Sequence, residues 1–142
     1  MSAHVLLIDD EVDFLEGLSE RMKLRGMNVE CSNSGTDALK RVTDDSFDAI
    51  ILDLQMPGMD GLEVLKQIRE KNDETQVILL TGHATVEKSI SAMKLGAMDF
   101  MEKPANLDML IEKIGKAHSK KMVLVERRVE GHVRDIVSHK GW

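Results

Sequence analysis

Short apolar runs alternate along the chain with segments whose apolar residues recur at helical spacing. This alternation is typical of a parallel sheet covered by helices. The first, third and fourth runs are the most apolar, as expected for strands buried on both faces, so we place them at the centre of the sheet. The predicted strands are residues 5–9, 29–32, 49–54, 77–81 and 99–102.

The segments between these runs are predicted to be helices. Right-handed crossovers would put them on both faces of the sheet, which favours an α/β fold. The predicted fold class is a flavodoxin-like (βα)5, doubly wound, parallel five-stranded sheet of order 2-1-3-4-5. The apolar positions at helical spacing are Phe14, Leu18 and Met22; Leu62, Leu65 and Ile68; Ile90, Met93 and, less regularly, Met98; and Leu107, Leu110, Ile111 and Ile114 in a last helix capped by Asn106.

Length and composition limit the number of domains and the location of the chain. Its 142 residues, 42% of them hydrophobic, allow one compact domain. Its single cysteine, Cys31, has no partner for an internal disulfide, which favours a reducing cytoplasm. The longest apolar runs have four residues, against about 20 for a membrane span, so we expect a soluble, cytoplasmic protein without a membrane partner.

The net charge of −6 is unevenly distributed, because residues 117–142 carry six Lys and Arg against three acids. The remaining body is therefore strongly acidic. Nucleic-acid-binding surfaces need clustered Lys and Arg, so we expect the body to make no direct contact with nucleic acid.

Reactive side chains stand where the predicted strands end. Asp9 and Asp10 are at the end of the first strand, Asp53 is at the end of the third, Thr81 ends the fourth, and Lys103 follows the fifth. In an open parallel sheet, ligands bind beyond the carboxyl ends of the strands. Three neighbouring carboxylates repel one another unless a cation lies among them. Oxygen ligands without histidine or cysteine select Mg²⁺.

Each of these residues alone also has an ordinary structural interpretation. Asp9 or Asp10 could cap the first helix, Thr81 could be a turn residue, and Lys103 a solvated charge. Together they converge on one site from four strands. A carboxylate can attack phosphorus to give an acyl phosphate, while Mg²⁺, a lysine and a hydroxyl surround the transferred oxygens.

These residues resemble the receiver domain of bacterial two-component response regulators, over roughly residues 3–118. Thr81 lies 28 positions and Lys103 lies 50 positions after Asp53, as in receivers. The Asp9-Asp10 pair, the MPGMDG loop at residues 56–61 and the Lys103-Pro104 pair carry the same resemblance. The TGHA stretch at residues 81–84 and the GA pair at residues 96–97 resemble receivers of the nitrogen-regulator group.

The resemblance implies a chemistry for each position. Asp53 would accept a phosphoryl group from a sensor histidine kinase or a phosphotransfer protein. Asp10, Asp53 and the backbone carbonyl of Gln55 would bind Mg²⁺, and Asp9 would act through water. The domain would be a signalling phosphoacceptor, with self-phosphotransfer and autodephosphorylation, rather than an enzyme acting on other substrates.

The resemblance also implies a conformational switch. On phosphorylation, the Thr81 hydroxyl would move to a phosphoryl oxygen and Phe100 would turn inward behind it. The alternative for Phe100 is a strand residue packed in the core. Gln55 and His83 would modulate dephosphorylation, although His83 also fits an ordinary exposed loop residue. The output face would be the fourth helix, the fifth strand and the fifth helix, and it would control a downstream effector protein or an output domain.

The chain continues beyond the predicted receiver domain, residues 1–118, as a basic tail or linker helix, residues 119–142. The tail could form a dimer on phosphorylation or bind a partner, but Gly131 interrupts it, so a frayed tail fits equally well. The chain is expected to be a stand-alone receiver or the receiver part of a longer regulator. The apolar stripe of the tail is Met122, Val125, Val129, Val133 and Ile136.

Two other functions are consistent with part of this pattern. An aspartyl-phosphate phosphohydrolase shares the nucleophile and Mg²⁺, but usually carries a second acid two residues after the nucleophile, where this chain has Gln55. A pseudo-receiver binds a partner without phosphorylation, but it has no need of the complete set of Asp9, Asp10, Asp53, Thr81 and Lys103.

Overall fold

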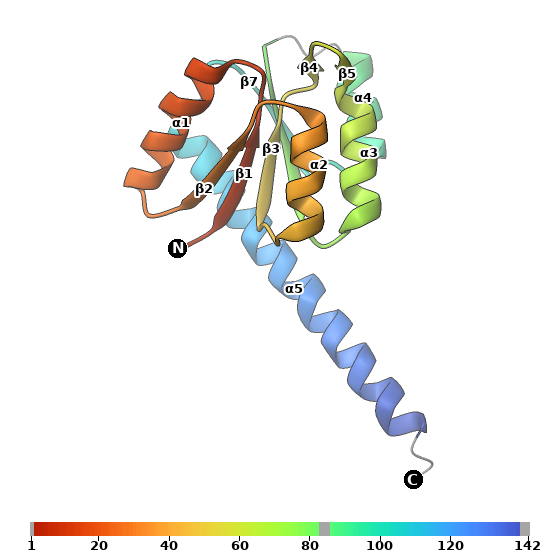
Figure 1. Cartoon of the computed structure of the whole chain (residues 1–142). Coiled ribbons are helices and arrows are strands. Elements are labelled where there is room, and N and C mark those ends of the chain that lie inside the picture. The colour runs from red at the N-terminus through yellow and green to blue at the C-terminus, as the bar shows by residue number, and fades with distance from the viewer. Residues whose placement is uncertain (1, 83–85, 140–142) are drawn as a thin grey trace.

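The computed structural model describes residues 2–82 and 86–139, and its centre is a parallel five-stranded sheet (Figure 1). The strand order, β2-β1-β3-β6-β7, confirms the predicted 2-1-3-4-5 arrangement of the five main strands. The strands are β1 (His4–Ile8), β2 (Asn28–Ser32), β3 (Ala49–Leu52), β6 (Gln76–Thr81) and β7 (Asp99–Glu102).

Helices cover both faces of the sheet, with α1 and α5 on one face and α2, α3 and α4 on the other (Figure 1). Alternate residues of β1 therefore serve two cores: Leu6 and Ile8 pack toward α2 and α3, whereas Val5 and Leu7 pack toward α1 and α5. The helices are α1 (Val12–Leu24), α2 (Gly35–Asp44), α3 (Gly61–Lys71), α4 (Val86–Lys94) and α5 (Leu107–His139).

Several element boundaries differ from the prediction. The first strand ends at Ile8 and the third at Leu52, so Asp9 and Asp53 lie just beyond the strands. The predicted fourth helix was too long, because α4 ends at Lys94 and Met98 lies in the connection to β7. That connection needs Gly96, whose φ of 103° lies in the left-handed region.

The N-terminal caps of α5 and α1 test two predictions from the sequence. The side chain of Asn106 accepts a hydrogen bond from the backbone N–H of Met109 at 3.1 Å, which confirms it as the cap of α5. Helix α1 begins after Glu11, whose side chain makes no cap hydrogen bond. The interpretation of Asp9 or Asp10 as the cap of α1 is therefore wrong, and both carboxylates are left for another role.

A small hairpin after β3 was not predicted as strands. It pairs β4 (Gln55–Met56) with β5 (Met59–Asp60) through a turn at Gly58, whose φ is 77°. Asp60 then caps α3 by accepting a hydrogen bond from the N–H of Leu62. At Gly61 a side chain has no room, because a Cβ would lie 2.4 Å from the Cα of Leu54.

Helix α5 continues as one helix well beyond the sheet (Figure 1). The interpretation of the tail as frayed is therefore wrong for the described residues, up to His139. Polar contacts hold the helix as it leaves the body: Lys121 Nζ donates to the backbone carbonyl of Phe47 at 2.9 Å, and Arg128 pairs with Glu74 at 2.7 Å. Among the described residues, no helix is long and apolar enough to cross a membrane.

Substitution of Gly61 by alanine is expected to lower the free energy of unfolding by about 1–3 kcal/mol, because the new Cβ meets backbone atoms that cannot rotate away. The matched control is Gly17→Ala in α1, where a Cβ meets no atom within 4 Å. The control should gain about 0.5–1 kcal/mol from helix propensity. Urea unfolding of both variants measures the difference, and equal stabilities would contradict the close approach at Gly61.

Candidate functional site

Three carboxylates meet at the carboxyl end of the sheet. Asp9 and Asp10 follow β1 and Asp53 follows β3, and one carboxylate oxygen from each lies within 4.8 Å of the others. Backbone hydrogen bonds position two of them: the N–H of Asp9 donates to Ser32 and the N–H of Asp53 donates to Ile8. The predicted convergence of these residues is therefore present in the structure.

Lys103 points into this group from the end of β7. Its Nζ lies 2.7 Å from Asp9 Oδ2 and 3.6 Å from Asp53 Oδ2. The backbone N–H of Lys103 donates to the carbonyl of Thr81, which brings the ends of β6 and β7 together. Two further residues, whose roles the sequence did not reveal, support the ammonium group: Glu11 Oε1 at 3.5 Å and the ring of Phe14 at 4.4 Å.

Asp9 and Asp53 are held in the same way. In each, Oδ1 accepts a backbone N–H two residues further on, from Glu11 or from Gln55, at 3.0 Å. The other oxygen, Oδ2, is the one that faces Lys103. Both carboxylates are almost completely buried, so their oxygens are fixed before any ligand arrives.

The electrostatics of the site favour an additional cation. Burial raises the pKa of Asp9 above its ordinary value, and the nearby charge of Asp53 adds to this, although the hydrogen bond from Lys103 opposes it. Burial lowers the pKa of Lys103, but the hydrogen bond and charge of Asp9, with the charges of Asp53 and Glu11, outweigh it, so its pKa lies above the ordinary value. The single positive charge of Lys103 thus offsets only part of the negative charge of Asp9, Asp10 and Asp53.

The donor set fits Mg²⁺. Asp9, Asp10 and Asp53 offer hard carboxylate oxygens, and Asp10 is exposed, so it leaves room for water in the coordination sphere. The group formed by Asp9, Asp10 and Asp53 contains no histidine or cysteine. A divalent cation here would also relieve the repulsion between the buried carboxylates of Asp9 and Asp53.

Thr81 is the last residue of β6 and is completely buried. Its hydroxyl has no hydrogen-bond partner within the part of the chain that the structure describes. A buried polar group without a partner costs about 1–3 kcal/mol. Thr81 also accepts the backbone N–H of Lys103 on its carbonyl, so its unsatisfied hydroxyl lies at the same edge of the sheet and favours a ligand that supplies an acceptor.

The remaining predicted site residues lie around this centre. Gln55 is exposed in β4, and His83 lies outside the described residues. Phe100 is 43% exposed, so its interpretation as a packed core residue is wrong. Its ring faces a surface pocket that Val86, Ile90 and Met93 of α4 also line.

Residues 5–115 match the response regulator receiver domain family. The chain belongs to this family. Receivers are signalling domains of two-component systems, and they typically bind Mg²⁺ at an acidic pocket. In this chain, Asp9, Asp10 and Asp53 form an acidic cluster.

Known relatives confirm the assignment. The chain is 39% identical over 106 residues to the regulatory protein AtoC of Escherichia coli (strain K12), covering 75% of this chain and 23% of AtoC. It is 34% identical over 124 residues to the C4-dicarboxylate transport transcriptional regulatory protein DctD of Rhizobium meliloti (strain 1021), covering 87% of this chain and 27% of DctD. The chain spans about a quarter to a half of the length of the curated relatives it matches.

Solved structures agree with this fold. A response regulator receiver domain protein from Clostridium thermocellum has a TM-score of 0.81 at 33% identity, covering 86% of this chain and 98% of that one. NtrX from Brucella abortus has a TM-score of 0.80 at 30% identity, covering 92% of this chain and 29% of NtrX. These matches confirm the resemblance to nitrogen-regulator receivers.

Replacing Thr81 by valine is expected to raise the free energy of unfolding by about 1 kcal/mol, because it removes a buried hydroxyl that has no partner among the described residues. The matched control is Thr75→Val, which removes a buried hydroxyl that donates to the carbonyl of Phe47 at 3.0 Å. The control should lose about 1 kcal/mol. Urea unfolding compares the two, and a loss at both positions would show that Thr81 has a partner in the free protein.

Proposed function

We propose that Asp53 accepts a phosphoryl group from the phosphohistidine of a sensor histidine kinase or a phosphotransfer protein. The arrangement of the Asp53 carboxylate carries this proposal. Oδ1 is fixed by the N–H of Gln55, and Oδ2 faces Lys103 at 3.6 Å beside the carboxylates of Asp9 and Asp10. The resemblance to receivers implies the same role for Asp53, as the residue that accepts the phosphoryl group.

The step is a nucleophilic substitution at phosphorus. A carboxylate oxygen of Asp53 forms the new P–O bond while the P–N bond to the donor imidazole breaks, and the leaving nitrogen keeps the electron pair. Lys103, which carries a positive charge close to Oδ2, would stabilise the negative oxygens of the transferred group. The hydroxyl of Thr81 would donate to one of those oxygens and gain the acceptor it lacks among the described residues.

Asp10, Asp53 and the backbone carbonyl of Gln55 would hold Mg²⁺, with Asp9 acting through water. When bound, the ion supplies positive charge that offsets both the carboxylates and the phosphoryl oxygens. The chain itself contributes the fixed carboxylate oxygens, the ammonium group of Lys103 and the shelter from bulk water at the buried Asp53.

We propose that the signal passes through Thr81 to Phe100. Leu79 and Phe100 are neighbours in the β6–β7 pairing, as are Thr81 and Glu102, so the two switch residues lie on adjacent strands. The exposed ring of Phe100 would turn inward when Thr81 moves to the phosphoryl group. Shifting such an equilibrium from 1:99 to 99:1 needs about 5.5 kcal/mol of differential binding. Gln55 and His83 would modulate the rate of dephosphorylation.

The partner of this switch would be a downstream effector protein or an output domain. The surface pocket between α4 and β7, where Phe100 lies, is predominantly apolar and would change shape as the ring turns. DctD is a transcriptional regulatory protein and AtoC a regulatory protein, each about four times as long as its match here, which supports an output domain as the target. Direct contact with nucleic acid is not assigned to the receiver body.

Incubation of the full chain with acetyl phosphate and Mg²⁺ should add the mass of one phosphoryl group, measured on the intact protein. The adduct should be absent from Asp53→Asn and from samples that contain EDTA. The matched control, Asp44→Asn, changes an exposed carboxyl group at the far end of α2 and should be labelled like the wild type. Labelling of Asp53→Asn would place the acceptor elsewhere, and no labelling of any sample would favour a pseudo-receiver.

The extension of α5 is proposed to join two copies of the chain on phosphorylation. Val129 and Val133 are about half exposed and lie one turn apart on α5. In light scattering, the phosphorylated wild type should have the mass of a dimer, and Val129→Glu/Val133→Glu that of a monomer. Arg127→Glu, away from this stripe on the same helix, should remain dimeric. A monomeric phosphorylated wild type would contradict the proposal.

A further inference from the structure

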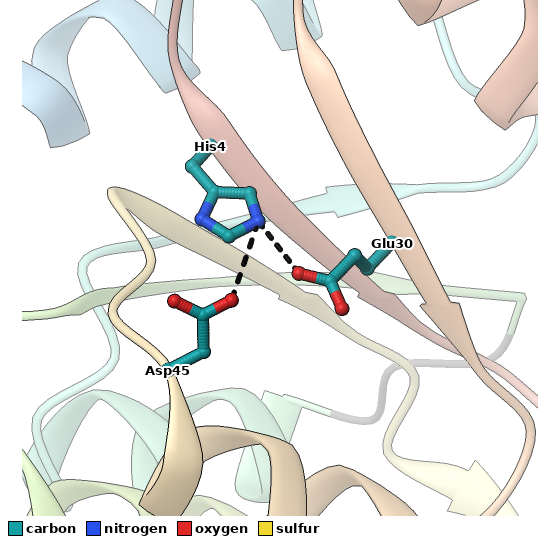
Figure 2. A group of neighbouring side chains, drawn as sticks. All are labelled: His4, Glu30 and Asp45. Carbon is teal, nitrogen blue, oxygen red and sulfur yellow. Dashed lines mark hydrogen bonds and ion pairs between the residues drawn. The ribbon is translucent and has the colours of Figure 1, made fainter.

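A second cluster of ligating side chains lies at the opposite end of the sheet from Asp53. It comprises His4 at the start of β1, Glu30 in β2 and Asp45 after α2 (Figure 2). The Nε2 atom of His4 lies 2.6 Å from Glu30 Oε2 and 3.9 Å from Asp45 Oδ2. The proposed phosphoryl chemistry uses none of these residues.

The contact made by Nδ1 of His4 shows which of its two ring nitrogens carries the proton. Nδ1 lies 2.9 Å from the backbone carbonyl of Ser46, which can only accept a hydrogen bond, so Nδ1 carries the proton. In a neutral ring, Nε2 then presents its lone pair to Glu30 Oε2 at 2.6 Å, and the two lone pairs repel. This arrangement therefore calls for a cation between the groups, either a proton on Nε2 or a metal ion.

Each of the three side chains makes a hydrogen bond through the atom that points away from the centre of the cluster. Glu30 Oε1 accepts a hydrogen bond from Arg41 at 2.9 Å, and Asp45 Oδ1 accepts the N–H of Ser46 at 2.8 Å. The ring of His4 is held by the carbonyl of Ser46 and packs against the ring of Phe47. Metal-binding histidines and carboxylates are typically oriented by such outer hydrogen bonds, while their inner atoms remain directed at the ion.

We propose that His4, Glu30 and Asp45 form a binding site for a divalent transition-metal ion of the zinc type. One imidazole nitrogen and two carboxylate oxygens suit Zn²⁺, with water as the fourth ligand. Tetrahedral coordination at about 2.0–2.1 Å places donor atoms about 3.3 Å apart. Glu30 Oε2 would move away from Nε2 and Asp45 Oδ2 would move toward it, each by less than about 1 Å.

The surroundings permit this adjustment. The side chains of Glu30 and Asp45 are 34% and 51% exposed, so both can change rotamer without disturbing a core. An ion here would link β1, β2 and the connection from α2 to β3. Lys121 of α5 binds the same connection, through the hydroxyl of Ser46 at 2.7 Å, so the site lies beside the base of the long helix.

Zinc titration of the full chain against a chromophoric chelator, in excess Mg²⁺ to occupy the carboxylates around Asp53, measures the affinity. The wild type should bind one zinc ion at this site, and His4→Gln and Glu30→Gln should each weaken binding at least about tenfold. Asp53→Asn should bind zinc like the wild type, because Asp53 is not part of the cluster. The zinc proposal and the phosphoacceptor proposal can therefore fail independently of each other. The matched control is His118→Gln, because His118 pairs with Asp48 and is outside the cluster.

Histidine ¹⁵N spectra of the wild type provide a second measurement that does not depend on any variant folding. Zinc should shift the Nε2 resonance of His4, and circular dichroism should show whether the variants retain their helices. The proposal fails if His4→Gln binds zinc as tightly as the wild type. It also fails if the Nε2 proton of His4 persists in the presence of zinc, because the cluster is then an ion pair only.

Discussion

The buried carboxylates of Asp9 and Asp53, and the positive charge that they require, are the constraint on which this structure depends. Lys103 supplies part of that charge at 2.7 and 3.6 Å, and burial still raises the pKa of Asp9. A fold that only had to be stable would not gather like charges at low solvent exposure. These charges suit the cation and the oxygen-rich anion that the proposed phosphoryl transfer to Asp53 needs.

The sheet brings these groups together because its strands are parallel. Asp9, Asp53, Thr81 and Lys103 follow or end four adjacent strands, and backbone hydrogen bonds between neighbouring strand ends fix their register. The two cores on either side hold that register, since a shift by one residue would exchange the faces of every side chain in β1. In the proposed switch, the Asp53 site and the exposed ring of Phe100 are connected through the paired strands β6 and β7.

The opposite end of the sheet has a separate polar network. His4 and Asp48 lie near the base of α5, where Asp48 accepts both the backbone N–H of His4 and a hydrogen bond from His118. Burial raises the pKa of Asp48, but these hydrogen bonds and the charge of Lys121 outweigh it, so its pKa lies below the ordinary value. The first part of the long helix packs into the core through Leu110, Ile114 and Ala117. These polar contacts hold the helix further along, where its apolar stripe is left largely exposed.

The sequence alone determined the five main strands, their order, the set of Asp9, Asp10, Asp53, Thr81 and Lys103, and the receiver family. Apolar periodicity and residue spacing are local properties, so they can be read without coordinates. Only the tertiary structure decided where strands end, that Phe100 is exposed, and that Glu11 and Phe14 support Lys103. It also decided that His4, Glu30 and Asp45 meet. These outcomes depend on packing between segments far apart in the chain, which local patterns do not encode.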